Sequence, residues 1–136
     1  MGEWGVGVFD NDSAPDWAYG LEGKTDTAYI ADTLDRVLEV GEDYLEAPDA
    51  EEGLAAAEAV ARIVGRWGVR NSYTETMDKW IESVKPTAGP DLVQKAARVV
   101  SRVLREPSEA LELWAESDEF EAWKAVAVEL RNRLGV

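Results

Sequence analysis

The stretch that decides the fold is a run of small residues in the middle of the chain, Leu54-Ala55-Ala56-Ala57-Glu58-Ala59-Val60-Ala61. Alanine has the highest helix propensity, and a helix that is small on nearly every side lets neighbouring helices approach closely. The segment before it, Pro48-Asp49-Ala50-Glu51-Glu52, places proline and three acids where the first turn of a helix favours them. We therefore predict a helix over about 48–66 that is the central, most buried element.

Apolar residues recur at helical spacing along most of the remaining chain. The periodicity predicts a short helix over about 13–22 with Ser13 as its cap, and an amphipathic helix over about 26–44. The remaining predicted helices lie between Thr74 and Pro86, over about 90–105, after a Pro107-Ser108 cap, and from a Ser117 cap to Gly135. Only residues 4–9 resemble a strand.

Length and composition indicate one globular domain. The 136 residues are 46% hydrophobic and include six tryptophans, which is enough to bury a single core. There is no apolar run long enough to span a membrane and no signal-peptide pattern, so we expect a cytoplasmic protein. The prediction is an all-α, compact single-domain bundle of about six or seven helices over residues 1–136. A non-helical, extended arm over residues 1–12, rich in glycine and aromatic residues, is expected to pack on this bundle.

The chain contains no histidine and no cysteine. Without histidine it lacks the usual general base near neutral pH, the commonest zinc ligand and the Ser-His-Asp triad. Without cysteine it lacks disulfides, thiolate metal sites and cysteine nucleophiles. Most hydrolase and metalloprotease functions are therefore excluded, and no cofactor is predicted apart from the magnesium considered below.

Negative charge is concentrated at the front of the chain. The net charge is −14, and residues 1–52 hold 15 Asp and Glu against two bases, Lys24 and Arg36. A surface of this kind repels nucleic acids and anionic membranes and attracts cationic partners. We therefore expect neither nucleic acid nor a membrane as partner. The alternative is that the charge only keeps the protein soluble.

One basic stripe is predicted, on the helix over about 90–105. Its apolar residues, from Leu92 to Leu104, are expected to face inward. The outward residues of the stripe are Lys95, Arg98, Arg102 and Arg105. Such a stripe can bind phosphate or RNA, but charge pairing with the acidic front half of the same molecule is the favoured interpretation.

The N-terminal arm combines glycines at positions 2, 5 and 7 with aromatic residues. Glycine lets the backbone lie close to a core, so we expect Trp4 and Phe9 to anchor the arm by burial. The Asp10-Asn11-Asp12 run resembles the start of a loop that binds a hard cation, with Asp10 and Asp12 as ligands. Ala14 stands where the third ligand should be. The favoured interpretation is that these side chains bond backbone groups in a turn before the first helix.

Five carboxylates follow one another at steps of three and four along the predicted helix 26–44 and just beyond it. They are Asp32, Asp35, Glu39, Glu42 and Glu46. Like charges at this spacing destabilise a helix unless something offsets them, so they are candidate contacts for a cationic partner. The simplest alternative is a solvated acidic face.

A magnesium site is a second interpretation of part of this pattern. Glu39 and Glu42, together with Glu75 and Asp78 on another helix, look similar in outline to the acidic motifs of all-α nucleotide pyrophosphohydrolases. Carboxylate oxygens are the ligands that magnesium prefers. This alternative predicts a magnesium-dependent enzyme that acts on nucleotides.

Trp67, beside Gly68, is the candidate for an exposed aromatic anchor at an interface, whereas the other tryptophans mostly fall on apolar faces. The leading hypothesis is a small interaction protein that engages a basic partner, for example as an immunity- or antitoxin-like inhibitor of a cationic nuclease. Besides the magnesium enzyme, the remaining alternative is a homodimer in which helical faces pair.

The opening residues and two later segments resemble a known family. Residues 2–12 match an arm of the type Gly-x-Trp-Gly-x-Gly-x-Phe-Asp-Asn-Asp, and Leu45-Glu46-Ala47-Pro48-Asp49-Ala50 leads into the alanine-rich helix. Glu112-Leu113-Trp114, and Trp123 followed by Glu129-Leu130-Arg131, look like the C-terminal pattern of that family. The chain thus resembles, over nearly its whole length, the uncharacterised bacterial domain-of-unknown-function family 4259. Pro15 departs from the usual leucine-type residue, and the resemblance implies no mechanism.

Overall fold

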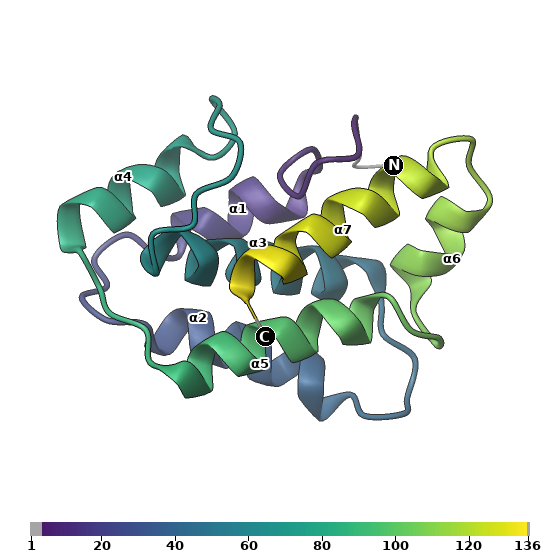
Figure 1. Ribbon diagram of the computed structural model, residues 1–136, viewed down its shortest axis with the longest axis horizontal. Coiled ribbons are helices and arrows are strands. Elements are labelled where there is room, and N and C mark those ends of the chain that lie inside the picture. Colours follow the sequence, from purple (N-terminus) through teal and green to yellow (C-terminus); the bar gives the residue numbers. More distant parts are fainter. Residues whose placement is uncertain (1–3, 136) are drawn as a thin grey trace.

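The computed structural model describes residues 4–135, which form seven α-helices and the connections between them (Figure 1). In chain order they are α1 (Ser13–Tyr19), α2 (Ala28–Glu39), α3 (Ala47–Ile63), α4 (Glu75–Val84), α5 (Pro90–Val103), α6 (Glu109–Ala115) and α7 (Phe120–Leu134). Residues 4–135 contain no strand, and an isolated parallel bridge joins Leu45 to Ser108. The all-α prediction is therefore confirmed.

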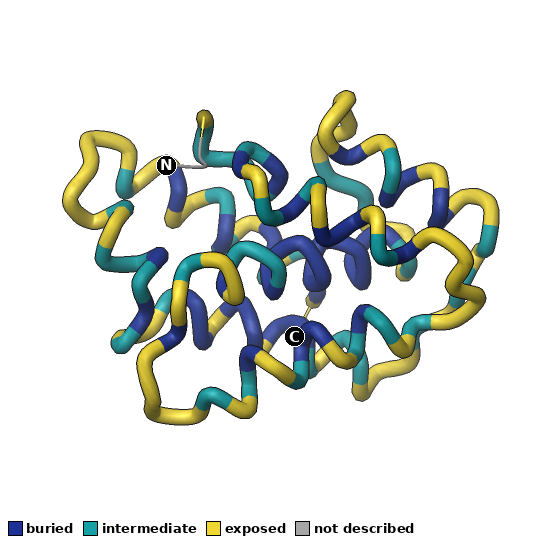
Figure 2. The backbone as a smooth tube through the Cα atoms, turned by 180° about the vertical axis from the view of Figure 1, so that it is seen from behind, coloured by how far each residue is buried: buried dark blue, intermediate teal, exposed yellow. Residues whose placement is uncertain are grey.

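Helix α3 is the centre of the fold, as its small residues predict. It packs against each of the other six helices. Every residue from Gly53 to Arg62 is buried, and Figure 2 shows this buried backbone in the middle of the molecule. Helices α1, α2, α5 and α7 surround it, and α4 and α6 close the two ends.

Gly53 marks the closest approach of α3 to its neighbours. A Cβ atom at this position would lie 2.7 Å from Cγ2 of Val37 on α2 and 3.0 Å from Cγ1 of Val99 on α5. Both distances are shorter than carbon atoms tolerate, and valine side chains have little rotamer freedom on a helix. Because Gly53 has no side chain, the backbone of α3 can lie close to α2 and α5 at the same point.

Indole and phenol groups fix α1 and α4 to the rest of the core. Trp17 of α1 is buried, and its Nε1 donates to Oγ1 of Thr33 on α2 at 2.7 Å. The hydroxyl of Tyr29 donates to the carbonyl of Trp17 at 2.7 Å, and Nε1 of Trp80 on α4 donates to the carbonyl of Lys24 at 3.0 Å. Each polar end of these large rings thus finds a partner, as burial requires.

Helix α2 ends earlier than its pattern predicts. It stops at Glu39, and Gly41 turns the chain through a left-handed conformation with φ of 60°. Glycine adopts this conformation without the strain that a Cβ introduces. Consequently Glu42 lies in the connection to α3, and Glu46 is the residue immediately before α3, so the prediction of five carboxylates along one helix was wrong.

The start of α1 also differs from the prediction. Ser13 is not the cap; the Asn11 side chain accepts the N–H of Ala14 at 2.8 Å and donates to the carbonyl of Val8 at 3.0 Å. Asn11 is buried, so its amide can satisfy the turn and the helix start together. The interpretation of this run as a turn is supported for Asn11.

The described part of the arm, residues 4–12, curls back on itself and is neither a strand nor an extended segment. The N–H of Trp4 donates to the carbonyl of Asp10 at 2.9 Å, and the N–H of Gly7 donates to Oδ2 of Asp10 at 3.0 Å. Phe9 is buried as predicted. Trp4 is half-exposed, with its ring centroid 5.1 Å from that of Tyr73, so its predicted burial was wrong. Gly2 lies outside the described residues.

Arg102 of α5 was predicted to face outward and is buried instead. Its guanidinium donates to the carbonyls of Gly41 at 3.0 Å, Asp43 at 2.7 Å and Pro107 at 2.9 Å. These carbonyls belong to the α2–α3 and α5–α6 connections, which run side by side and need a shared donor. The charge of Arg102 is therefore used to join two loops.

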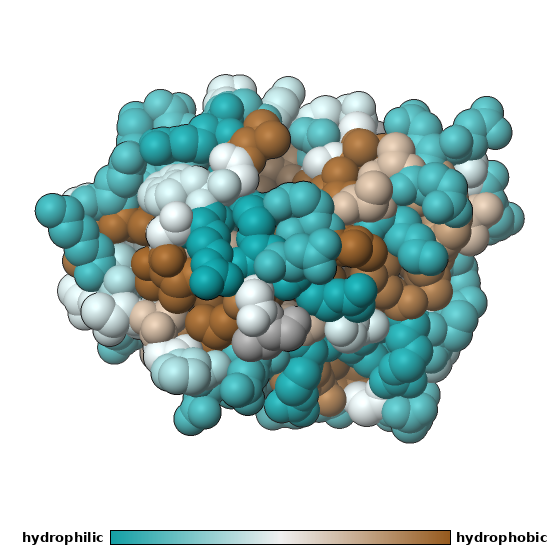
Figure 3. All heavy atoms as spheres, in the orientation of Figure 1, coloured by the Kyte–Doolittle hydropathy of each residue, from teal (hydrophilic) through white to brown (hydrophobic). Residues whose placement is uncertain are grey.

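On the face shown in Figure 3, apolar side chains reach the surface in several groups separated by hydrophilic ones. Within residues 4–135, no helix is both long enough and apolar enough to cross a membrane.

Replacing Gly53 with valine tests the close contact on α3. The new side chain would overlap Val37 and Val99, so the free energy of unfolding should fall by about 2 kcal/mol or more. Ala122→Val, at an exposed position of α7, adds methyl groups without a clash and should change it by less than about 1 kcal/mol. Urea unfolding of both variants provides the measurement, and equal losses would show that α3 is not tightly packed.

Candidate functional site

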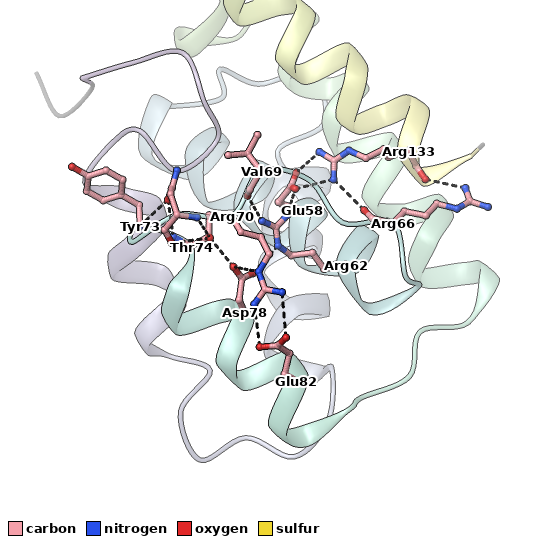
Figure 4. A network of polar contacts seen from close by, with 11 residues as sticks. Glu58, Arg62, Arg66, Val69, Arg70, Tyr73, Thr74, Asp78, Glu82 and Arg133 are labelled. Atoms are coloured by element: carbon pink, nitrogen blue, oxygen red, sulfur yellow. Dashed lines mark hydrogen bonds and ion pairs between the residues drawn. The ribbon is translucent and has the colours of Figure 1, made fainter.

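A network of charged side chains is buried where α3, α4 and α7 meet (Figure 4). Glu58 and Arg62 lie one turn apart on α3, and both are buried. Asp78 of α4 is also buried, whereas Arg133 of α7 is partly buried. Ionised groups are rarely buried unless they are paired, so these four residues must satisfy one another.

Arg62 holds the network together. Its Nε donates to Oδ1 of Asp78 at 2.7 Å, one Nη donates to Oε1 of Glu58, and the other donates to the carbonyl of Val69. The guanidinium thus links two helices and the loop between α3 and α4. Its planar fork of donors suits this task better than the single ammonium of lysine.

Arg133 completes the charge balance from α7. Its two terminal nitrogens each donate to a different carboxylate oxygen of Glu58, both at 2.9 Å, and its Nε donates to Glu129 at 2.6 Å. Burial acts to lower the pKa of Arg133, but the hydrogen bonds to these two carboxylates outweigh it and raise the pKa above the ordinary value. Arg133 therefore stays charged.

The loop between α3 and α4 closes over this network. A Cβ atom at Gly68 would lie 2.6 Å from Oε1 of Glu58 and 2.7 Å from Nη1 of Arg133, so only glycine fits there without a shift. The Trp67 ring lies 5.4 Å from the guanidinium carbon of Arg62 and 4.6 Å from that of Arg70. Trp67 is only partly exposed and stacks on its own protein, which differs from the exposed anchor we expected.

The network was not predicted from the sequence, although a signal was present. Glu58 and Arg62 are charges spaced i, i+4 inside a helix that is otherwise small and apolar on nearly every side. Within residues 4–135 every buried side-chain nitrogen or oxygen has a hydrogen-bond partner. The arrangement is therefore built to stabilise the contact between helices, since each charge is held by another.

A cleft of about 590 Å³ opens above the network. Glu58 and Arg62 of the network line it. Residues 6–10 of the arm, Val69 of the loop and Ala125 and Val126 of α7 line it as well. Its size is that of a small-molecule site, but Glu58 and Arg62 are already paired with each other.

A second polar region lies at the other end of α3, where the α2–α3 and α5–α6 connections meet. The N–H of Leu45 donates to the carbonyl of Pro107 at 3.1 Å, and the N–H of Glu109 donates to the carbonyl of Leu45 at 2.8 Å. The bridge brings together carboxylates that are about sixty residues apart in sequence. We call this group the acidic seam: Glu42, Asp43, Glu46, Glu106, Glu109 and Glu112.

Tyr44 lies within the acidic seam. Its hydroxyl donates to Oε1 of Glu112 at 3.0 Å, and the residue is 48% exposed. Partial burial, the hydrogen bond to Glu112 and the negative charges of Glu112, Glu109 and Glu106 raise the pKa of Tyr44 to about 12. The phenol therefore responds to the carboxylates gathered around it.

The structure separates the residues of the predicted magnesium site. Glu46 precedes α3, and Arg62, which pairs with Asp78, lies 16 residues further on, about 24 Å along the helix axis. Glu42 lies near the first end and pairs with Arg105 at 3.3 Å, whereas Glu75 pairs with Lys79 at 2.9 Å. Within the described chain there is no group of three or more acidic residues positioned to hold a metal ion.

The other candidate metal ligands lie in the arm. The Asp10 carboxylate accepts the N–H of Gly7, and Asp12 is exposed immediately before α1. A Cβ atom at Gly5 would lie 2.5 Å from Oδ2 of Asp10, so the arm is wrapped closely around this side chain. The Asp10 carboxylate therefore serves as a hydrogen-bond acceptor within the arm.

The candidate residues for partner binding are mostly exposed. Asp32, Glu39 and Glu46 are exposed, and within the described residues none of them forms an ion pair. Asp35 pairs with Lys95 at 2.7 Å, and Glu42 pairs with Arg105. The predicted pairing of the basic stripe with the acidic front half is thus confirmed for Lys95 and Arg105.

Replacing Arg62 with methionine tests the buried network. The change removes the buried Arg62 donors from Oδ1 of Asp78 and from Oε1 of Glu58, which leaves Arg133 as the partner of Glu58 and Thr74 and Arg70 as the partners of Asp78. Unfolding should then need about 3–5 kcal/mol less free energy. Arg36→Met removes an exposed pair with Glu52 and should cost less than about 1 kcal/mol. Chemical unfolding compares the two variants; similar losses would mean that the Arg62 pairs are open to solvent.

Glu112→Gln tests the electrostatics of the acidic seam. Removing this charge should move the pKa of Tyr44 from about 12 towards its ordinary value of about 10. The measurement is a titration of tyrosinate absorbance. The same titration of Tyr44→Phe shows which part of the absorbance change belongs to Tyr44. Glu116→Gln, at the end of α6, is the matched control and should leave the pKa in place.

The raised pKa of Tyr44 has a defined effect on stability. The interactions of the protonated Tyr44 phenol contribute to the free energy of unfolding. This contribution is fully present below about pH 10, where the phenol is protonated in both the folded and the unfolded chain, and it is lost as the pH rises towards 12. Tyr44→Phe should remove this part of the pH dependence. An unchanged pH dependence would show that the phenol does not sense the carboxylates.

Comparisons with known proteins identify a family and leave the chemistry of the chain open. Searches of the curated proteins and of the solved structures return no significant match. The family described as Domain of unknown function (DUF4259) matches residues 2–126, which is most of the chain. On that match the chain belongs to the family Domain of unknown function (DUF4259).

Proposed function

We propose that this chain is a protein-interaction module whose acidic seam engages a basic partner. The observation that carries the proposal is the meeting of two acidic connections at the Leu45–Ser108 bridge. An immunity- or antitoxin-like inhibitor of a cationic enzyme is one example of this class of function.

The seam is held in a fixed shape before any partner arrives. Besides the two backbone hydrogen bonds of Leu45, Oε1 of Glu109 accepts the N–H of Ala47 at 2.7 Å, and Oε1 of Glu106 accepts the N–H of Ser108 at 3.0 Å. Buried Arg102 binds carbonyls of both connections from below. A preformed surface loses less conformational entropy on binding, which favours affinity.

The composition of the seam resembles that of a protein interface. Tyr44, with an exposed fraction of 48%, is a large side chain within the seam, and its hydroxyl is bonded to Glu112. Leu113, which follows Glu112 on α6, is 41% exposed. Interfaces typically combine such aromatic or aliphatic anchors with a polar rim. A tyrosine ring can also accept the cationic group of an arginine or lysine.

The net charge of −14 reinforces this surface. The field of the whole molecule speeds the approach of a cationic partner, and the local carboxylates orient it. Both effects weaken as salt is added. The proposal therefore requires association that is salt-sensitive and depends on the seam in particular.

A defined cationic peptide separates the seam from the general negative charge. We would measure its binding by calorimetry to the seam variant Asp43→Asn/Glu46→Gln/Glu112→Gln and to the control Asp12→Asn/Asp16→Asn/Glu22→Gln, using a short peptide rich in arginine and lysine. Both variants lose three negative charges. The seam variant should lose about tenfold in affinity, and the control less than about threefold.

Photocrosslinking identifies the partner itself. A photoreactive phenylalanine at position 44 should trap a basic protein in extracts of the source cells, whereas the same group at exposed Tyr19 of α1 should not. Equal losses of peptide affinity in the two triple variants, or the same trapped proteins at both positions, would show that the seam has no specific role.

A further inference from the structure

A basic groove lies between α5, α7 and the C-terminal end of α2. Its volume is about 620 Å³. Four arginines line it: Arg98, Arg102 and Arg105 from α5 and the turn that follows, and Arg131 from α7. Within the described residues no carboxylate lines this groove. A concentration of positive charge is unexpected in a molecule with a net charge of −14.

The four guanidinium groups differ in how far the protein uses them. Arg102 is buried, and its guanidinium donates to backbone carbonyls, so its positive charge is fixed in place at the groove. Within residues 4–135, Arg131 donates to Oγ of Ser101 at 3.4 Å. Arg98 is exposed, and no acceptor or carboxylate in the described chain bonds to it. Arg98 and Arg131 therefore keep most of their donors available.

Arg105 lines the groove and also contacts Glu42 of the acidic seam. It pairs with Glu42 at 3.3 Å, but the side chain of Glu42 is 86% exposed and that of Arg105 is 48% exposed. Exposed pairs of this kind contribute little stability, so a better acceptor in the groove can displace Glu42.

Like charges at close spacing repel one another in this groove. Arg98 and Arg102 are spaced i, i+4, and Arg102 and Arg105 are spaced i, i+3. Burial first, and then the charge of Arg105, lower the pKa of Arg102, whereas the charge of Glu42 acts to raise it. An anion bound among these groups would relieve the repulsion and gain charge-assisted hydrogen bonds.

We propose that this groove binds a small phosphate-bearing ligand. Guanidinium groups bind phosphate through two parallel hydrogen bonds, and a phosphate monoester carries a charge near −2, which matches Arg98 and Arg131. Leu38 and Ala97 line the same groove and offer apolar contacts for the rest of the ligand. The volume accommodates a molecule of nucleotide size.

The surrounding charge sets an upper limit on the size of the ligand. A long polyanion would extend beyond the groove over a surface with a net charge of −14 and be repelled. A molecule with one to three phosphates stays within the basic region. The site therefore selects compact phosphates over nucleic acid.

Binding of pyrophosphate and AMP to the full chain tests this inference. Calorimetry at low ionic strength should detect both. The variant Arg98→Gln/Arg131→Gln should lose about tenfold or more in affinity for pyrophosphate. The control Arg36→Gln/Lys124→Gln removes two exposed cations elsewhere and should lose less than about threefold. Glu42→Gln, which frees Arg105, should bind pyrophosphate more tightly.

Several results would overturn the proposal. These are an absence of binding at millimolar concentration, equal losses in the two double variants, or tighter binding of a single-stranded oligonucleotide than of pyrophosphate. Citrate binding as tightly as pyrophosphate would show a general anion site rather than a phosphate site. None of these results bears on the acidic seam, because Arg98→Gln/Arg131→Gln leaves its carboxylates in place.

Discussion

The rest of the structure depends on one steric constraint, the close approach of α3 to its neighbours. Gly53 and the alanines that follow it allow α2 and α5 to lie against the α3 backbone, where a single methyl group at position 53 would collide with both. Because α3 touches all six other helices, its position fixes where each of them lies. Packing of this kind tolerates little change in volume. The fold is thus organised around the smallest side chains rather than the largest.

Residues 53–62 of α3 are buried and cannot expose their polar side chains to water. Glu58 and Arg62 must therefore be neutralised inside the protein, and partners come from α4 and α7 as Asp78 and Arg133. The α3–α4 loop lies close against this network, with Gly68 next to Glu58 and Arg133. Packing and electrostatics act together here, since the ion pairs join helices that meet around α3.

Local sequence patterns predicted the helices well. They did not predict features that depend on contacts between distant segments. The centrality of α3, the Ser108 cap of α6 and Gly135 at the end of α7 follow from residue types and spacing. The early end of α2 and the burial of Arg102 depend on loops about sixty residues apart, which periodicity cannot show. Of the candidate residues for partner binding, Glu42 and Glu46 lie in the acidic seam instead of on one helix with Asp32, Asp35 and Glu39. The other seam carboxylates, Glu106, Glu109 and Glu112, come from a distant segment, which helical spacing cannot show.

The ion pair between Arg105 and Glu42 belongs to two surfaces at once, because one residue lines the basic groove and the other lies in the acidic seam. Any molecule that draws Arg105 into the groove frees a carboxylate on the seam, and any cation that takes Glu42 frees a guanidinium in the groove. Each event therefore favours the other. By thermodynamic reciprocity the gain is the same in both directions. If the groove and the seam bind the ligands proposed above, this weak surface contact couples an anion and a cation without a change of fold.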